Sequence, residues 1–221
     1  TESRFADADW SAKQSKVFLD LLLAHGTTSA LVFSTSHKVA SEALFSAAHA
    51  YNMAITTGRV MMDCNAPDGV RDTAEASYEE SRELIARWHG TGRQRYAVTP
   101  RFAATSTPEQ LSYAGKLMTE AEGLLMQTHW AENKAEIAWI AELFPERASY
   151  LDVYDHFGLL GPRSVLAHGI HIDDADRARL AETGTRIAFC PTSNTFLGSG
   201  LFDLASARGA DVEVGLASDV G

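Results

Sequence analysis

Short apolar runs recur along the chain, separated by more polar segments that contain helical patterns. The runs are apolar at consecutive positions, which is typical of strands buried on both faces of a parallel sheet. Alternation of such runs with helices is typical of a parallel α/β architecture. We therefore predict seven strands, over residues 29–35, 54–62, 95–102, 123–129, 164–170, 186–192 and 212–219.

The segments between the strands carry recognisable helix start and stop signals. Residues 12–25 repeat apolar side chains at helical spacing. Thr107, Pro108 and Gln110 are typical of an N-cap, a proline at position N1 and a capping-box glutamine at position N3. Helix starts are predicted at Thr107, Asn133 and Ser149, and helix ends at Gly26, Gly184 and Gly209.

The strand count favours a closed barrel over a doubly wound sheet. The chain contains no G-x-G-x-x-G turn and no P-loop, which are the nucleotide-binding signatures of open sheets. A (β/α)8 barrel has eight strands in about 250 residues. Seven strands in 221 residues therefore predict a TIM-type barrel that lacks its first strand. No linker or repeat divides residues 1–221, so we expect a single domain.

Composition and charge narrow the classes of function. The chain is 45% hydrophobic and 22% charged, as expected of a globular protein, and its formal net charge is −10. This charge argues against nucleic acid or an anionic membrane as a partner. No apolar run approaches the ~20 residues of a membrane span. Cys64 and Cys190 are too few for a disulfide framework, which favours a reducing cytoplasm.

Polar side chains lie where four of the predicted strands end. Arg101, His129, His168 and Asp219 occupy these positions, and Glu132 lies three residues beyond His129. The carboxyl ends of all strands in a barrel meet at one face, where active sites are built. We therefore expect these side chains to converge on one pocket.

The residue types at these strand ends predict metal-assisted hydrolysis. Histidine and aspartate are common zinc ligands. Zinc lowers the pKa of its bound water to about 7. Glu132 would then carry protons beside the metal without binding it. Imidazole ligands suit iron as well as zinc.

Each of these residues also has a structural interpretation. A single histidine at a strand end is more often hydrogen-bonded than metal-bound, Glu132 favours the start of the next helix, and Asp219 suits a helix N-cap. Arg101 would equally pair with a surface carboxylate. The coincidence of four polar strand ends favours the functional interpretation.

Other candidate residues are better explained by structure. His171 follows His168 by three residues, and we expect it to make a loop hydrogen bond. Cys190 ends an apolar run and is expected to be a small buried hydrophobe. Trp88 and Trp139 are expected to pack within helices.

Several motifs together resemble the guanine deaminase family of the amidohydrolase superfamily. They are "AVTPRFAATS", "QTHWAENKAEIAW", "VLAHGIHIDDAD", "IAFCPTSNTFLGSGLFDL" and "VGLASDVG", with "GTTSALVFST" and "GRVMMDCNAPD" nearer the start. Any one of them is weak evidence, but their combination and order are specific. The resemblance implies a (β/α)8 barrel that deaminates guanine to xanthine and ammonia in purine metabolism.

The resemblance also implies roles for individual residues. His129 and Asp219 would bind one zinc ion per chain. Glu132 would shuttle protons, His168 would hold the attacking water and the developing charge, and Asp219 would help to deprotonate the water.

Arg101 and Phe102 match the pair that holds the purine in this family, and Glu132 and His168 would also contact it. The guanidinium would bind the exocyclic oxygen, and the phenyl ring would pack on the purine. The implied partners are guanine and water, and the implied assembly is a homodimer.

The chain departs from the family pattern in one respect. The family's first strand carries an H-x-H pair that provides two further zinc ligands, and no H-x-H occurs here. We therefore expect residues 1–221 to be the central part of a longer barrel, about strands 2 to 8, without the family's small β domain. The alternatives are deamination of another amino-heterocycle, such as 8-oxoguanine, a pterin, cytosine or a triazine, and a non-catalytic barrel module.

Overall fold

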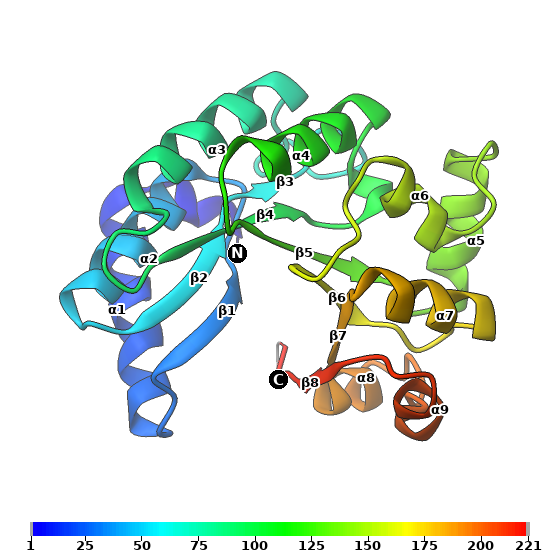
Figure 1. The fold of residues 1–221 in the computed structure, drawn as a ribbon. Coiled ribbons are helices and arrows are strands. Elements are labelled where there is room, and N and C mark those ends of the chain that lie inside the picture. The colour runs from blue at the N-terminus through cyan, green and yellow to red at the C-terminus, as the bar shows by residue number, and fades with distance from the viewer. Residues whose placement is uncertain (1, 220–221) are drawn as a thin grey trace. The chain divides into compact units, whose positions relative to one another are not determined.

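A computed structural model describes residues 2–219 of the chain. The chain forms two compact units, one of Thr1–Arg101 with Thr105–Leu125 and the other of Phe102–Ala104 with Met126–Gly221. Strands and helices alternate in both units, as Figure 1 shows, and the pairings within each unit are parallel. The predicted α/β class and parallel pairing are thus confirmed, whereas the single-domain assignment of residues 1–221 stays a prediction.

The first unit has a small parallel sheet and four α-helices. Strand β1 pairs with β2, β2 with β4, and the short β3 also with β4. The strands are β1 (Ser29–Phe33), β2 (Ala54–Gly58), β3 (Val60–Met61) and β4 (Arg95–Pro100). The helices are η1 (Glu2–Ala6), α1 (Ala8–Ala24), α2 (Lys38–Ala50), α3 (Ala74–Trp88) and α4 (Pro108–Glu120).

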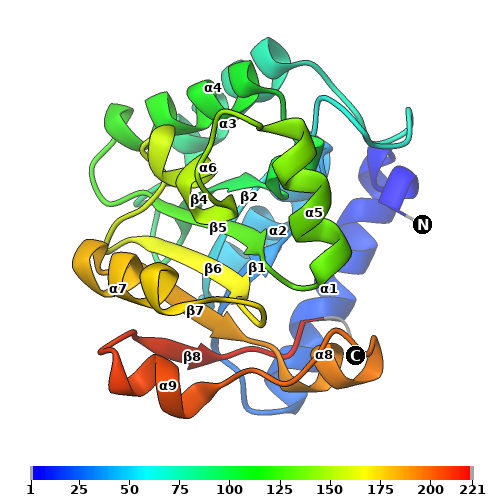
Figure 2. The ribbon, with the colours of Figure 1, turned by 90° about the vertical axis from the view of Figure 1, so that its right-hand side faces the viewer.

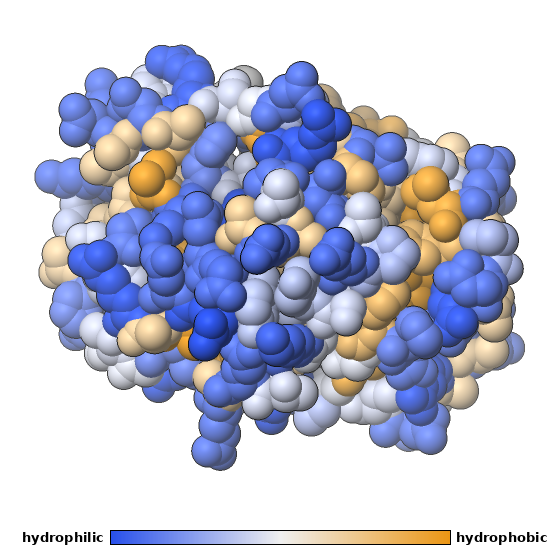
Figure 3. Space-filling view, turned by 90° about the horizontal axis from the view of Figure 1, so that it is seen from above, coloured by the Kyte–Doolittle hydropathy of each residue, from blue (hydrophilic) through white to orange (hydrophobic). Residues whose placement is uncertain are grey.

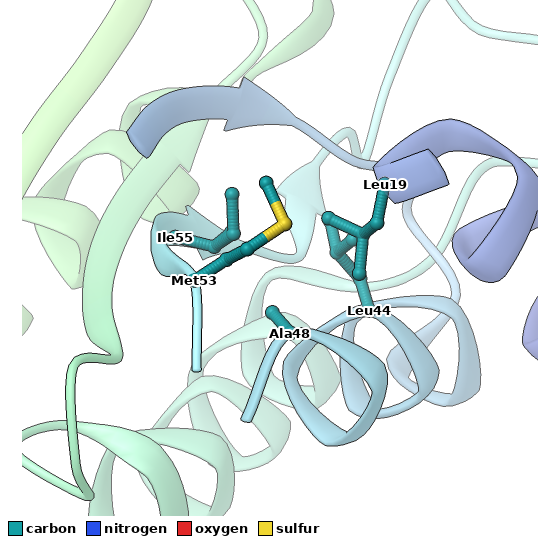
Figure 4. Close-up of a cluster of buried hydrophobic side chains, with 5 residues drawn as sticks. All are labelled: Leu19, Leu44, Ala48, Met53 and Ile55. Atoms are coloured by element: carbon teal, nitrogen blue, oxygen red, sulfur yellow. The ribbon is translucent and has the colours of Figure 1, made fainter. Parts of the chain in front are cut away.

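A buried cluster joins α1 and α2 to the edge of this sheet. Figure 4 shows Leu19 of α1 and Leu44 and Ala48 of α2 gathered with Met53 and Ile55. Leu44 and Ala48 are one turn apart on α2, so both face the same neighbour. Burial of each large side chain contributes about 1.5–3 kcal/mol, which fixes the helices on the strands.

The prediction of one continuous strand over residues 54–62 is wrong. The apolar run at 54–62 is not one strand, because it is interrupted at Arg59 between β2 and β3. Arg59 is only 2% exposed and donates from Nε and Nη2 to the Ser36 carbonyl. It also forms ion pairs with Asp72 and, at 3.0 Å, with Glu80. A buried guanidinium needs these partners. The register to β4 is the same on both sides of Arg59, so the interruption is confined to this residue.

The second unit holds most of the candidate site. Its strands pair in chain order, and Figure 2 shows β6, β7 and β8 side by side. The strands are β5 (Leu125–Trp130), β6 (Ser164–His168), β7 (Arg186–Phe189) and β8 (Val214–Leu216). The helices are η2 (Ala103–Thr105), α5 (Lys134–Leu143), α6 (Tyr150–His156), α7 (Asp174–Thr183), α8 (Pro191–Phe196) and α9 (Leu204–Gly209).

The helix starts follow the predicted caps. Thr107, Asn133 and Ser149 each accept a hydrogen bond from a backbone N–H three residues later, at 3.2, 2.8 and 3.1 Å. The capping box at Thr107 is only half formed. The Gln110 side chain bonds Ser106 and Ser77 instead, and Asp63 accepts from the Thr107 amide.

The predicted helix ends are mostly confirmed. Gly26 follows α1 with φ of 78°, and Gly184 ends α7 with φ of 70°. Both values lie in the left-handed region, where glycine has no steric cost. Gly209 is the last residue of α9 rather than a stop beyond it, and α1 begins at Ala8, four residues before the predicted start.

An apolar cavity of about 470 Å³ opens among α5, α6 and α7 of the second unit, where Ile137, Phe144 and Val153 contribute apolar surface. Figure 3 shows a hydrophobic strip on the side of the molecule where α5 and α6 lie in Figure 1. Within the described residues, no helix combines the length and apolar character needed to cross a bilayer.

Candidate active site

Two histidines meet at the carboxyl ends of β5 and β6. In the parallel register His129 pairs with Ala167, and Trp130 pairs with His168. Regular alternation would place His129 and His168 on opposite faces. His168, however, has φ of 75°, and its ring stacks on the His129 ring with centroids 5.4 Å apart and planes 24° apart. The bend at the end of β6 thus brings together two side chains that a straight strand would separate.

His168 is held on one side by a neutral amide. Its side chain is 1% exposed, and Nδ1 lies 2.9 Å from Oδ1 of Asn194, which is equally buried in α8. Its other ring nitrogen, Nε2, faces Oε2 of Glu132 at 3.8 Å. This distance exceeds that of a hydrogen bond, so the two atoms do not bond each other and both are available to one small molecule beside them.

Glu132 is fixed through one of its two carboxylate oxygens. Oε1 accepts a hydrogen bond from the Ser199 hydroxyl at 2.9 Å, and Oε2 points to His168. The side chain is 19% exposed. Its own backbone N–H donates to Glu136, whose amide is capped by Asn133. The start of α5 therefore sets the backbone, while the Ser199 loop sets the carboxylate.

Asp219 lies beyond β8 and approaches His168 from a third strand end. Ligand atoms of His168, Cys190 and Asp219 all lie within 4.8 Å of one another. Asp219, like His168, has a positive φ, here 53°. Non-glycine residues in this region are strained, and such strain clusters at functional sites. The donor set of nitrogen, sulfur and carboxylate oxygen suits a divalent transition metal.

Cys190 is a buried thiol beside this group. It is 2% exposed, and Sγ donates to the Ala188 carbonyl at 3.3 Å. Burial raises the pKa of the Cys190 thiol to about 11, and the carboxylates of Asp219 and Glu132 add to the effect. The predicted burial is confirmed, but the sequence did not indicate its closeness to His168 and Asp219.

The structure leaves the two predicted purine-binding residues in different units. Arg101 belongs to the first unit and forms an ion pair with Glu2 at 3.1 Å, the alternative that its sequence context left open. Phe102 belongs to the second unit, where its ring meets the edge of Trp139 with centroids 6.1 Å apart. Trp139 is 38% exposed and contacts Phe102, so its role goes beyond packing within its helix.

Three further residues support the site through hydrogen bonds. His171 makes the predicted loop hydrogen bond, from Nε2 to the Ser199 carbonyl at 2.9 Å. Ser199 and Asn194 were missed by sequence reasoning. Both lie in the "CPTSNTFLGSG" segment, where asparagine, serine and two glycines among apolar residues were the available signal.

Known proteins resemble this chain in sequence along its whole length. The sequence model of the Amidohydrolase family matches residues 11–221. Guanine deaminase of Escherichia coli K12 is 50% identical over 221 residues, which are 100% of this chain and 50% of that protein. The chain thus spans about half the length of the relatives it matches.

Two solved structures extend the likeness to three dimensions. The structure of E. coli guanine deaminase matches with a TM-score of 0.98 and 50% identity, covering 100% of this chain and 52% of that one. Guanine deaminase from C. acetobutylicum with bound guanine in its active site matches with a TM-score of 0.96 and 30% identity, over 99% and 52% of the two chains. These matches confirm the predicted fold class, the TIM-type barrel of amidohydrolases.

Proposed function

This chain belongs to the Amidohydrolase family, and we propose that the whole protein hydrolyses guanine to xanthine and ammonia. The observation that carries the proposal is the meeting of His129, Glu132, His168 and Asp219 around strand ends in a chain 50% identical to a guanine deaminase. Two stacked imidazoles and two carboxylates provide the metal ligands and proton carriers that hydrolysis of an amino-heterocycle needs.

The donor set on these strands fits a divalent metal such as zinc. We assign His129 and Asp219 as ligands, because imidazole nitrogen and carboxylate oxygen are ordinary zinc donors. Cys190 lies close but uses its S–H on a backbone carbonyl, so it is not assigned. When bound there, zinc would supply a water with a pKa near 7.

The proton transfers fall to Glu132. Its Oε1 is held by Ser199, so Oε2 is the oxygen that accepts a proton from water. The same carboxyl group then protonates the ring nitrogen next to C2. It next takes the second proton from the hydroxyl group that has formed on C2 and delivers it to the departing amino group. His168 lies 3.8 Å from Oε2 and holds the oxygen that adds to C2. Water adds, ammonia leaves and the C2 amine becomes a carbonyl, so atoms and protons balance.

Specificity for guanine is assigned to Arg101 and Phe102. A guanidinium only donates hydrogen bonds, so it matches the C6 carbonyl of guanine and not the C6 amine of adenine. Phe102, whose other edge contacts Trp139, supplies a flat apolar surface for the ring. Binding in this way requires Arg101 to leave its ion pair with Glu2 and to donate to the purine oxygen instead.

A substrate panel on the natural full-length protein tests the proposal. Guanine, adenine, 8-oxoguanine, cytosine and a triazine are offered in turn, and ammonia release is measured. We expect guanine to be turned over and adenine not. Arg101→Ala is expected to weaken kcat/KM for guanine by about 1.5–3 kcal/mol, the range for a hydrogen bond to a charged group.

Arg93→Ala provides the matched control, because Arg93 is an exposed arginine of the same unit that donates to the Asn52 carbonyl. It should leave kcat/KM unchanged. Equal rates on guanine and adenine would refute the assignment of guanine as substrate. Unchanged preference in Arg101→Ala would show that the purine is recognised by other residues.

The cellular location and the assembly state of the protein are part of the same proposal. Among the described residues, neither Cys64 nor Cys190 forms a disulfide, which suits a reducing cytoplasm. We propose a homodimer that takes guanine and water as its partners. Sedimentation velocity of the natural protein at two concentrations would give its assembly state directly.

A further inference from the structure

We propose that Asn194 is a positioning residue that holds His168 in the tautomer with its proton on Nδ1, so that Nε2 offers a lone pair to the reacting water. The inference rests on the proposed hydrolysis and adds a residue to which the sequence assigned no role. The juxtaposition that carries it is a buried amide oxygen on one nitrogen of His168 and a carboxylate facing the other.

The hydrogen bond between the two side chains fixes which nitrogen carries the proton. Oδ1 of Asn194 lies 2.9 Å from Nδ1 of His168, and both side chains are 1% exposed. An amide oxygen only accepts, so Nδ1 must donate, and the neutral ring then has its lone pair on Nε2. Water does not compete for a bond buried to this degree.

Asn194 is itself anchored where it can serve this purpose. It lies in α8, which begins at Pro191 directly after β7, and its backbone N–H donates to the Cys190 carbonyl at 2.9 Å. Its amide nitrogen Nδ2 is buried and has no hydrogen-bond partner among the described residues. A buried donor without a partner costs about 1–3 kcal/mol. The bond of Oδ1 to His168 is the contact that offsets this cost.

The tautomer decides what fits between His168 and Glu132. Nε2 and Oε2 are 3.8 Å apart, and in the Nδ1–H tautomer both are acceptors. A water molecule beside both atoms would donate one proton to each of them, and its oxygen lone pairs would remain free to attack carbon. In the opposite tautomer Nε2–H would donate toward Glu132, occupying the oxygen that must receive the proton. The hydrogen bond from His168 to Asn194 therefore leaves the reacting water two acceptors, Nε2 of His168 and Oε2 of Glu132.

The test measures the tautomer and the rate separately in the natural full-length protein with its metal. Histidine is labelled with ¹⁵N, and the His168 signals are assigned by their loss in a His168→Gln variant. Protonated and unprotonated ring nitrogens differ in ¹⁵N shift, so the proton is located without reference to catalysis. In the unmutated protein we expect the proton on Nδ1. A proton on Nε2 instead would overturn the proposal.

The decisive variant is Asn194→Leu, which keeps the side-chain size and removes the acceptor. We expect His168 to lose its preference for Nδ1–H and kcat to fall about 10–100-fold, as for loss of a residue that orients a catalytic group, with KM changed much less. Asn194→Asp restores an acceptor oxygen and should recover both the Nδ1–H signal and at least tenfold of the lost kcat. Thr195→Ala, on the same short helix but exposed, is the matched control and should change neither quantity.

Unaltered tautomer and kcat in Asn194→Leu would refute the proposal. If Asn194→Leu does not fold, the unmutated protein and Asn194→Asp still decide, because each must show the proton on Nδ1. Failure of the unmutated protein to deaminate guanine would refute the proposed function alone, since the ¹⁵N measurement does not depend on the substrate.

Discussion

Each unit of the chain buries a charged or titratable side chain at a strand end, but the two surroundings differ. In the first unit, Arg59 follows β2 and is faced by the carboxylates of Asp72 and Glu80. In the second unit, His168 ends β6 and is held by a neutral amide, and the nearby carboxylate of Glu132 stays 3.8 Å away. The two side chains are almost equally buried, at 2% and 1% exposure.

The difference lies in whether the cluster provides its own counter-charges. Around Arg59 a cation meets anions, so the group is complete and ties the segment after β3 to the sheet. Around His168 two carboxylates, Glu132 and Asp219, gather near neutral side chains. Such a cluster favours an added cation and a proton-carrying water. A buried charged or titratable side chain therefore does not by itself indicate a functional site. Nearby charges that are not balanced by the cluster do indicate one.

Removal of a metal ligand should have the largest effect. His129→Ala is expected to take the metal content of the full-length protein from about one per chain to near zero and to lower activity by more than about 10⁴-fold, because metal and nucleophile are lost together. Elemental analysis and ammonia release measure the two. His156→Ala, an exposed histidine of the same unit, is the control. Full metal content in His129→Ala would refute the ligand assignment.

The next effect separates proton transfer from metal binding. Glu132→Gln keeps the side-chain shape and the contact with Ser199 but cannot carry a proton. We expect metal content to stay at about one per chain while kcat falls by about 10²–10⁴-fold. A near-normal kcat would show that Glu132 has only a structural role at the start of α5. Glu146→Gln, an exposed glutamate, should behave as the unmutated protein.

The first unit should respond in stability rather than in chemistry. Arg59→Met leaves Asp72 and Glu80 without their cation and is expected to cost about 3–5 kcal/mol in the free energy of unfolding. Chemical denaturation measures it. Arg71→Met removes an ion pair with Asp68 that is exposed on both sides, and should cost less than about 1 kcal/mol. Equal losses in the two variants would contradict the view that the Arg59 cluster holds this unit together.

The smallest expected effect is a pH dependence in the same cluster. Burial raises the pKa of Asp72 to about 6, and outweighs the opposing effect of Arg59. Because the folded state then holds the proton more tightly than the unfolded state, this group stabilises the fold at low pH. That contribution is lost as pH rises from about 4 to about 6.

We expect the loss to be on the order of 1–2 kcal/mol, since partial solvent access weakens the effect. Urea denaturation at several pH values would show it as a decline between pH 4 and 6. Asp72→Asn should flatten that part of the profile, and an unchanged decline would assign it to another group.

The parts of the fold that could be predicted are those set by local sequence. Thr107, Asn133 and Ser149 start helices because their side chains satisfy the first free N–H groups, which no distant residue needs to arrange. The ion pairs of Arg59 could not be predicted, because Asp72 and Glu80 lie beyond β3, and local sequence does not show that they face Arg59.

The candidate site divides in the same way. Residues at strand ends were accessible to prediction because parallel strands place their carboxyl ends together, and His129, His168 and Asp219 follow that rule. Asn194 and Ser199 could not be predicted, because each supports the site through one hydrogen bond to a residue that is distant in sequence. The approach of His129 to His168 also depends on a backbone angle that side-chain pattern does not encode.

That backbone angle at His168 limits the residues that can ever occupy the position. With φ of 75°, β-branched residues such as valine would be excluded by sterics before their chemistry mattered. Glycine would relieve a strain of order 1–3 kcal/mol, but it would remove the imidazole. A substitution of His168 by glycine would therefore gain stability and lose the imidazole of the proposed site, so the two properties oppose each other at this position.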